Sequence, residues 1–266
     1  MARVERNTSS IYYEVTGSGP AIVLGHSFLC SGKMWEPQIQ PLSWGYQVIN
    51  VDLRGHGRSG IMDQPFDLYD LVDDVLFVLD HLAVEQAVWA GLSIGGMVAL
   101  RAALVARERV AGLILLDTDA GAETRVNRLK FGTMVAVTRL LGTGSLVPQV
   151  ARMFFGRQTR SLNPGLVEEW KEHFSNVPLP AILRTVQALK ERDSILERLC
   201  EITVPALVIV GEQDRLLPPA CSREIVELLN DASLAVIANA GHLPTLERPE
   251  ATTSAMLSFL GGLQVR

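Results

Sequence analysis

The chain has 266 residues, of which 48% are hydrophobic and 20% are charged, and its formal net charge is −5 at pH 7. This length and composition suffice for one sizeable buried core with a smaller inserted domain, and the acidic balance argues against nucleic acid or an anionic membrane as a partner. The three cysteines are widely spaced and form no CxxC pair, which argues against a disulfide framework and against a zinc site.

Residues 1–7 lack the apolar segment that a signal peptide contains. No apolar run in the sequence reaches the roughly 18 residues that are needed to span a bilayer. We therefore expect a cytoplasmic protein with no nucleic-acid partner and no membrane partner.

Strands and helices are predicted to alternate through the first 116 residues. Residues 68–82 carry apolar side chains at three- and four-residue steps, such as Leu71, Val75 and Leu79, which indicates an amphipathic helix. A second helix is predicted over 95–106, and strands are predicted over 10–15, 21–24, 47–51, 88–90 and 112–116. Continuous apolar strands that alternate with helices are typical of a parallel sheet covered on both faces.

The pattern changes between residues 120 and 192. Strand signals are absent there, and helices are predicted over 126–141, 147–155, 166–174 and 179–190. Strands resume over 204–208 and 233–238, and a helix is predicted over 250–260. We therefore expect an α/β core formed by residues 1–119 and 193–266, with residues 120–192 forming a helical cap (lid) domain over the strand ends.

The expected cap is basic, with 11 Lys and Arg side chains against 5 Asp and Glu side chains. Such a charge would suit a substrate that carries a carboxylate, but solvated helix faces that complement an acidic core are the favoured interpretation. The large apolar side chains of the cap either line an acyl pocket or pack within the cap itself; they are Phe131, Met134, Phe154, Phe155 and Trp170.

The most informative stretch is Val88–Gly96, where a buried strand leads into Gly91-Leu92-Ser93-Ile94-Gly95 and then into a helix. A Gly-x-Ser-x-Gly pattern in this context is typical of a tight turn that exposes the serine hydroxyl above a helix N-terminus. A serine becomes a useful nucleophile when a base and an orienting acid stand nearby. Without such partners, Ser93 would be a simple helix N-cap.

Two later residues supply the missing partners. Asp214 and His242 each follow an apolar strand, and the chain order Ser, Asp, His is that of a catalytic triad on an α/β sheet. Because open α/β sheets build their sites at the carboxyl ends of the strands, we expect the three side chains to converge there. Asp117 and Asp119, which follow the strand over 112–116, are the rival positions for the acid.

Several motifs match a known family together. They are Gly25-His26-Ser27-Phe28, Asp52-Leu53-Arg54-Gly55-His56-Gly57-Arg58-Ser59, Gly91–Gly96, Gly211-Glu212-Gln213-Asp214 and Ala240-Gly241-His242. On these residues the chain resembles the α/β-hydrolase superfamily over essentially its whole length. Trp35-Glu36-Pro37-Gln38 and the segment Phe154–Trp170 make it most similar to the 3-oxoadipate enol-lactonase branch and related small carboxylesterases.

The resemblance implies an α/β-hydrolase fold, with a mostly parallel eight-stranded sheet, helices on both faces and a helical cap insertion. It also implies an acyl hydrolase that uses no cofactor and no metal. Ser93 would attack the carbonyl carbon, His242 would serve as general base and then general acid, and Asp214 would orient the imidazole.

The oxyanion hole implied by the resemblance consists of the backbone N–H groups of Phe28 and Ile94. Many relatives have His-Gly where this chain has His26-Ser27. Because glycine allows backbone conformations that serine disfavours, this departure puts the Phe28 donor in question.

The resulting prediction is a serine carboxylesterase or lactonase whose partner is a small-molecule ester or lactone. Two alternatives stand beside it: a C–C bond hydrolase of ring-cleavage products that uses the same triad, and a ligand-binding protein of this fold with little turnover. The sequence leaves open which ester is used and whether the protein is a monomer or a homo-oligomer.

Overall fold

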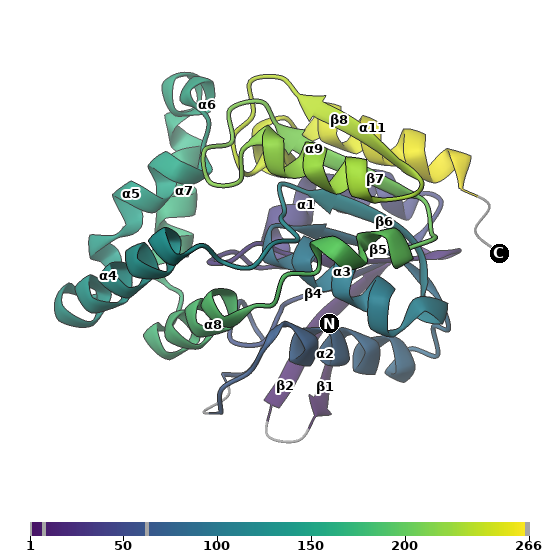
Figure 1. Ribbon diagram of the computed structural model, residues 1–266, viewed down its shortest axis with the longest axis horizontal. Helices are drawn as coiled ribbons and strands as arrows, with labels where there is room; N and C mark the ends of the chain where they lie inside the picture. The colour runs from purple at the N-terminus through teal and green to yellow at the C-terminus, as the bar shows by residue number, and fades with distance from the viewer. Residues whose placement is uncertain (1, 7–8, 62–63, 264–266) are drawn as a thin grey trace.

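A computed structural model describes residues 2–6, 9–61 and 64–263 of the chain. Its centre is an eight-stranded sheet with the strand order β1-β2-β4-β3-β5-β6-β7-β8 (Figure 1). The strands are β1 (Ala2–Arg6), β2 (Ser9–Thr16), β3 (Ala21–Gly25), β4 (Gln47–Val51), β5 (Ala87–Leu92), β6 (Val110–Leu116), β7 (Ala206–Gly211) and β8 (Ala232–Ile237). Strand β2 pairs antiparallel with β1 and β4, whereas β3 to β8 are all parallel. The predicted mostly parallel sheet of eight strands is confirmed.

Helices cover both faces of this sheet. All residues of β5 and β7 are buried, as expected for parallel strands between two helical layers. On one face α1 (Glu36–Ser43) contacts α11 (Pro249–Gly262), and on the other lie α2 (Leu68–His81), α3 (Ile94–Val105) and α9 (Pro219–Leu228). Among the residues described, no helix combines the length and the apolar composition that a membrane crossing requires.

The elements of the core that the sequence pattern did not predict include β1, α1 and α9. Prolines occupy the first turns of both helices, and α1 also contains Pro41 in its interior. Proline is well tolerated at a helix start because the N–H that it lacks would have no partner there, so residues that suggest a loop by composition open these two helices. Strand β1 is a polar edge strand and carries little apolar signal.

Five helices follow one another between β6 and β7. They are α4 (Arg125–Leu141), α5 (Val147–Phe154), α6 (Arg157–Leu162), α7 (Pro164–Ser175) and α8 (Leu179–Glu191). Helices α4 to α7 lie together beside the sheet, at the left of Figure 1. The backbone N–H of His242 donates to the carbonyl of Phe154 at the end of α5 (2.8 Å), so these helices contact the loop that follows β8. The division of the chain into a core and a cap domain of residues 120–192 stays a prediction.

Candidate active site

Ser93 occupies a strained turn between β5 and α3. Its backbone has φ 56° and ψ −114°, a conformation that residues other than glycine rarely adopt. The turn is held to strand β6 and the residues after it, because the Ser93 N–H donates to Leu116 O (2.9 Å) and the Thr118 hydroxyl donates to Ser93 O (2.7 Å). The Ser93 hydroxyl makes no capping hydrogen bond to α3. Ser93 therefore occupies the N-cap position of α3, but its hydroxyl does not cap the helix.

The two glycines of the motif permit close backbone contacts. A Cβ atom on Gly91 would lie 2.2 Å from the backbone of Gly95, and a Cβ atom on Gly95 would lie 2.2 Å from the carbonyl oxygen of Gly25. Real side chains do not approach backbone atoms that closely, so any larger residue would force the turn apart. The glycines thus let α3 start directly against β3 and β5.

Asp214 and His242 form a buried hydrogen-bonded pair. Asp214 Oδ2 lies 2.8 Å from His242 Nδ1, and both side chains are fully buried. Asp214 Oδ1 accepts the N–H groups of Leu216 (2.8 Å) and Leu217 (3.2 Å), which fixes the carboxylate. The opposite ring nitrogen, His242 Nε2, is buried and has no hydrogen-bond partner among the residues described. The ring is therefore held at one end and left unpaired at the other.

The topology brings the predicted residues to one edge of the sheet. Ser93 follows β5, Asp214 follows β7 and His242 follows β8, and β6 lies between β5 and β7. All of these strands are parallel, so the three residues share the carboxyl edge, where open α/β sheets place their sites.

Of the two rival acids, only Asp117 lies beside the pair. Asp117 is fully buried after β6, and its Oδ1 accepts the N–H of Gly211 (2.8 Å). Asp119 instead pairs with Arg192 (3.0 Å). Burial first, and the neighbouring Asp214 charge second, raise the pKa of Asp117 well above the ordinary value for aspartate. The carboxylate that contacts His242 Nδ1 belongs to Asp214.

Asp117, Asp214 and His242 have potential ligand atoms that all lie within 4.8 Å of one another. Among the described residues, they form the cluster whose side chains are close enough to bind a metal ion together. A cation there would have to compete with the Asp214–His242 hydrogen bond for the same atoms, and Asp117 Oδ1 already accepts a backbone N–H. These residues fit a hydrogen-bonded triad better than a metal centre.

The loop after β3 is fixed by His26. His26 Nε2 accepts the N–H of Leu53 (2.9 Å), so Nδ1 carries the proton and donates it to Ser27 O (2.8 Å). Burial lowers the pKa of His26 to about 4, which keeps the ring neutral. The residue in the left-handed region is Leu29 (φ 62°), and Ser27 does not have a positive φ. The backbone of this loop therefore does not require glycine at position 27.

Two backbone donors face no acceptor at this edge. Phe28 lies in the turn that closes with the Cys30 N–H donating to Ser27 O (3.1 Å), and Ile94 is the first residue of α3. Neither N–H has a hydrogen-bond partner among the residues described. A helix N-terminus leaves such donors unpaired, and both could donate to an anionic oxygen.

Glu247 is a buried residue of this site that the sequence interpretation missed. It lies in α10 (Pro244–Glu247), and its Oε1 accepts the N–H groups of Gly241 (2.8 Å) and Leu243 (3.3 Å), the two residues that flank His242. Its Oε2 accepts the N–H of Gly156, between α5 and α6 (2.8 Å). Glu247 thus ties the His242 loop to the helices between β6 and β7. An acidic residue five positions after the histidine, in an otherwise apolar stretch, was the available signal.

A small apolar cavity of about 20 Å³ lies between the loop after β3 and the helices between β6 and β7. None of its lining side chains is charged: they are Phe28, Leu29, Met134, Thr138, Thr143, Leu146, Val147, Val150, Phe174 and Ile182. Met134 was among the predicted lining residues. Phe154 instead packs on the His242 ring, with centroids 5.1 Å apart.

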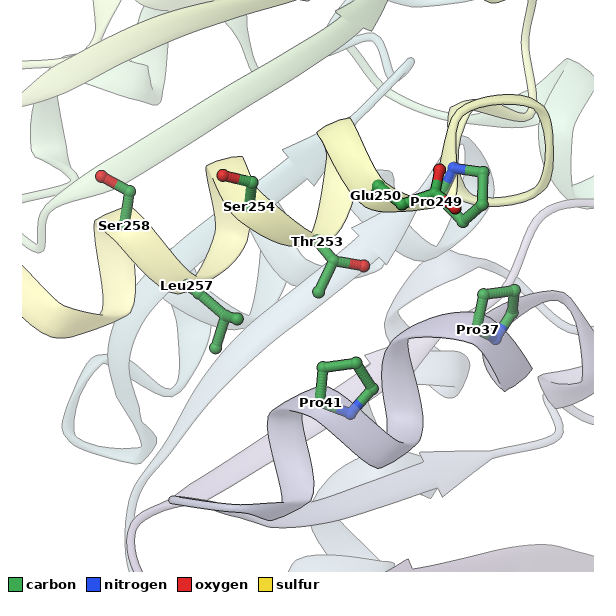
Figure 2. Close-up of a pocket in the computed structure, with 8 residues that line it drawn as sticks. All are labelled: Pro37, Pro41, Pro249, Glu250, Thr253, Ser254, Leu257 and Ser258. Atoms are coloured by element: carbon green, nitrogen blue, oxygen red, sulfur yellow. The ribbon is translucent and has the colours of Figure 1, made fainter.

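A larger open groove of about 700 Å³ lies between α1 and α11 (Figure 2). Its lining side chains come from those two helices: Pro37, Pro41, Pro249, Glu250, Thr253, Ser254, Leu257 and Ser258. None of them is a predicted site residue. The groove lies on one face of the core, and its lining includes none of the residues Ser93, Asp214 and His242 at the carboxyl edge of the sheet.

The comparisons with known proteins agree with this geometry. A family model described as "alpha/beta hydrolase fold" matches residues 20–249. The chain is 33% identical to "Putative carbamate hydrolase RutD" of Caulobacter sp. (strain K31), over 95% of this chain and 96% of the relative. It is 26% identical to 3-oxoadipate enol-lactonase 1 of Acinetobacter baylyi, over 97% and 94%. Among solved structures, a malate-bound thermophilic esterase from Thermogutta terrifontis superposes with a TM-score of 0.94 at 28% identity, covering all of both chains.

Proposed function

Since the chain belongs to the α/β-hydrolase fold family, we propose that it is a serine hydrolase that cleaves small carboxylic esters or lactones through an acyl-enzyme on Ser93. The observation that carries the proposal is the buried Asp214–His242 hydrogen bond, which leaves His242 Nε2 unpaired. The strained Ser93 turn at the same edge of the sheet supports it. Relatives named as an enol-lactonase and as an esterase are consistent with ester chemistry.

The hydrogen bond to Asp214 determines what His242 does. With the proton of Nδ1 held by Asp214, Nε2 carries the lone pair and takes the proton of the Ser93 hydroxyl as the oxygen attacks the carbonyl carbon. The same proton then passes to the leaving alkoxide, and the ester bond breaks. In the second half, His242 takes a proton from water, the hydroxide oxygen bonds to the acyl carbon, and Ser93 recovers its proton as the acid leaves.

The negative charge of each tetrahedral intermediate requires fixed donors. The unpaired N–H groups of Phe28 and Ile94 fill this role in our proposal, because neither has another acceptor among the residues described. Donors that are already oriented stabilise developing charge without reorganisation, and losing one typically costs about 10²- to 10³-fold in kcat.

The cavity beside Phe28 is small and apolar, which supports a small, uncharged acyl group in our proposal. Its described lining contains two threonines as the only polar side chains and no basic side chain that would bind a carboxylate. Burying a charge in such surroundings is costly. We therefore propose that simple esters and unsubstituted lactones are better substrates than carboxylate-bearing lactones.

Hydrolysis of p-nitrophenyl acetate and butyrate, with γ-lactones and a simple carbamate in the same panel, tests the proposal. Ser93→Ala and His242→Ala are each expected to lower kcat for the nitrophenyl esters at least about 10³-fold. Ser254→Ala, in the groove of Figure 2, serves as the matched control and should retain activity. Unchanged turnover by folded Ser93→Ala would rule out the acyl-enzyme.

A further inference from the structure

A second buried carboxyl group lies beside the Asp214–His242 pair and has no part in the proposed mechanism. Asp117 Oδ1 accepts one hydrogen bond, from the N–H of Gly211, whereas Oδ2 is buried with no partner other than the Asp214 carboxyl group. Asp117 and Asp214 offer oxygens within 4.8 Å of each other. Two buried carboxyl groups at this separation do not both remain ionised.

The donors around each carboxyl group decide which one keeps the proton. Asp214 accepts three hydrogen bonds, from Leu216 N, Leu217 N and His242 Nδ1. Asp117 accepts only the one from Gly211. Because hydrogen-bond donors stabilise the charged form, Asp214 is the carboxylate and Asp117 is the carboxylic acid.

The remaining charged groups near Asp117 favour the same assignment. Glu247, in α10, adds a third acidic side chain that acts on Asp117, and no Lys or Arg is paired with Asp117 among the residues described. The titratable groups that face Asp117 are thus Asp214 after β7, Glu247 in α10 and His242 after β8. Burial and the Asp214 charge raise the pKa of Asp117 in the same direction.

The backbone holds the Asp117 side chain in this place. Asp117 has φ 41°, and its N–H donates to Ile209 O in β7 (2.9 Å). Aspartate and asparagine tolerate the left-handed region better than most residues. An asparagine can therefore replace Asp117 without added backbone strain.

We propose that Asp117 is a positioning residue that remains protonated and donates a hydrogen bond from Oδ2 to the Asp214 carboxylate, so that His242 is oriented by a carboxylic acid–carboxylate pair. The proposal rests on the proposed function and deepens it. The fourth donor stabilises the negative charge of Asp214 and fixes the orientation of its carboxylate. It also weakens the pull of Asp214 on the Nδ1 proton of His242.

The first test measures the rate at which a fluorophosphonate labels Ser93 as a function of pH, because this readout needs no natural substrate. Asp117→Asn keeps a neutral donor. The pH at which its labelling rate falls to half on the acidic side, called the acidic limb, is expected within about 0.3 pH unit of the wild-type value. Asp117→Gly suits the positive φ but has no donor, and its acidic limb is expected about one unit higher. A downward shift of one unit or more in Asp117→Asn would show that the substitution removed a negative charge, which overturns the proposal.

The second test measures unfolding by urea from pH 5 to 8 and does not depend on catalysis. A carboxyl group whose pKa is raised on folding contributes stability that is present below its unfolded value, near 4, and is lost as pH rises toward the folded value. The folding constant of the wild type should therefore fall about tenfold per pH unit relative to Asp117→Asn, whose amide does not titrate. A difference that is independent of pH contradicts the proposal.

The two tests separate this proposal from the proposed function. Failure of the wild type to react at Ser93 would reject the serine hydrolase, while the urea measurement would still report the protonation of Asp117. If Asp117→Asn does not fold, the infrared band of a protonated carboxyl group in the folded wild type, compared with Asp117→Gly at pH 7, gives the same answer. A band of equal intensity in both proteins contradicts the proposal.

Discussion

Replacing Ser93 with glycine is expected to inactivate the protein and to stabilise it. Ser93 has φ 56° and ψ −114°, and its hydroxyl makes no capping hydrogen bond to α3. Backbone strain of this kind costs about 1–3 kcal/mol, and glycine relieves it. Glycine also makes the unfolded chain more flexible, which offsets about 0.4–1 kcal/mol, so the net gain in the free energy of unfolding is about 0.5–2 kcal/mol. For a chain of this size, that gain raises Tm by about 1–8 °C.

Ser93→Ala is the matched control, because it removes the same hydroxyl but retains the Cβ atom and the strain. We expect its free energy of unfolding to lie within about 0.5 kcal/mol of the wild type. Urea unfolding and calorimetry measure the stability of the three proteins, and nitrophenyl ester hydrolysis measures their activity. A glycine variant that is no more stable than the alanine variant would refute the strained turn, and substantial activity in either would refute the nucleophile.

Three further predictions concern Asp214, Glu247 and His26. Asp214→Asn places an amide N–H against His242 Nδ1 and should lower kcat by about 10³–10⁴-fold. The kcat of Asp119→Asn should stay within about tenfold of the wild-type value. Equal losses of kcat in the two variants would argue against Asp214 as the acid. Glu247→Gln sets an amide N–H against a backbone N–H, so it should lower the free energy of unfolding in urea by about 2–3 kcal/mol and should lower kcat more than it changes KM. Its control is Glu250→Gln, at an exposed position. Equal stability of the two variants would contradict the role of Glu247. Burial lowers the pKa of His26 to about 4, so its neutral ring contributes about 3 kcal/mol of stability above pH 6.5, and this contribution is lost as pH falls toward 4. In His26→Gln the stability should depend less on pH over this range. An unchanged pH dependence would count against a neutral His26.

The sequence was sufficient to predict every strand of the sheet except β1, and the edge that carries the site. Ser93, Asp214 and His242 each end a strongly apolar strand, and the rule that parallel strands share a carboxyl edge brings such residues to one place. The structure joins Asp214 to His242 directly. Ser27 stands where many relatives have glycine, but the loop after β3 does not need glycine there, because the residue with a positive φ is Leu29.

The contacts that depend on strand order were out of reach of sequence patterns. Asp117 lies beside Asp214 only because β6 pairs with β7 in the sheet, and no periodicity encodes that neighbour. Glu247 is recognisable only once its carboxylate is seen to accept backbone N–H groups from both sides of His242. The helices α1 and α9 were missed because prolines in their first turns resemble loop composition.

The most direct test of the account is covalent labelling of the folded wild-type protein with a fluorophosphonate, followed by mass spectrometry of the peptides. We predict a single phosphonylated residue, Ser93, with labelling abolished in Ser93→Ala and slowed at least about 10²-fold in His242→Ala. A folded protein that carries no adduct on Ser93, or that is labelled equally well after His242→Ala, would contradict the central claim that these residues form a nucleophile and its base.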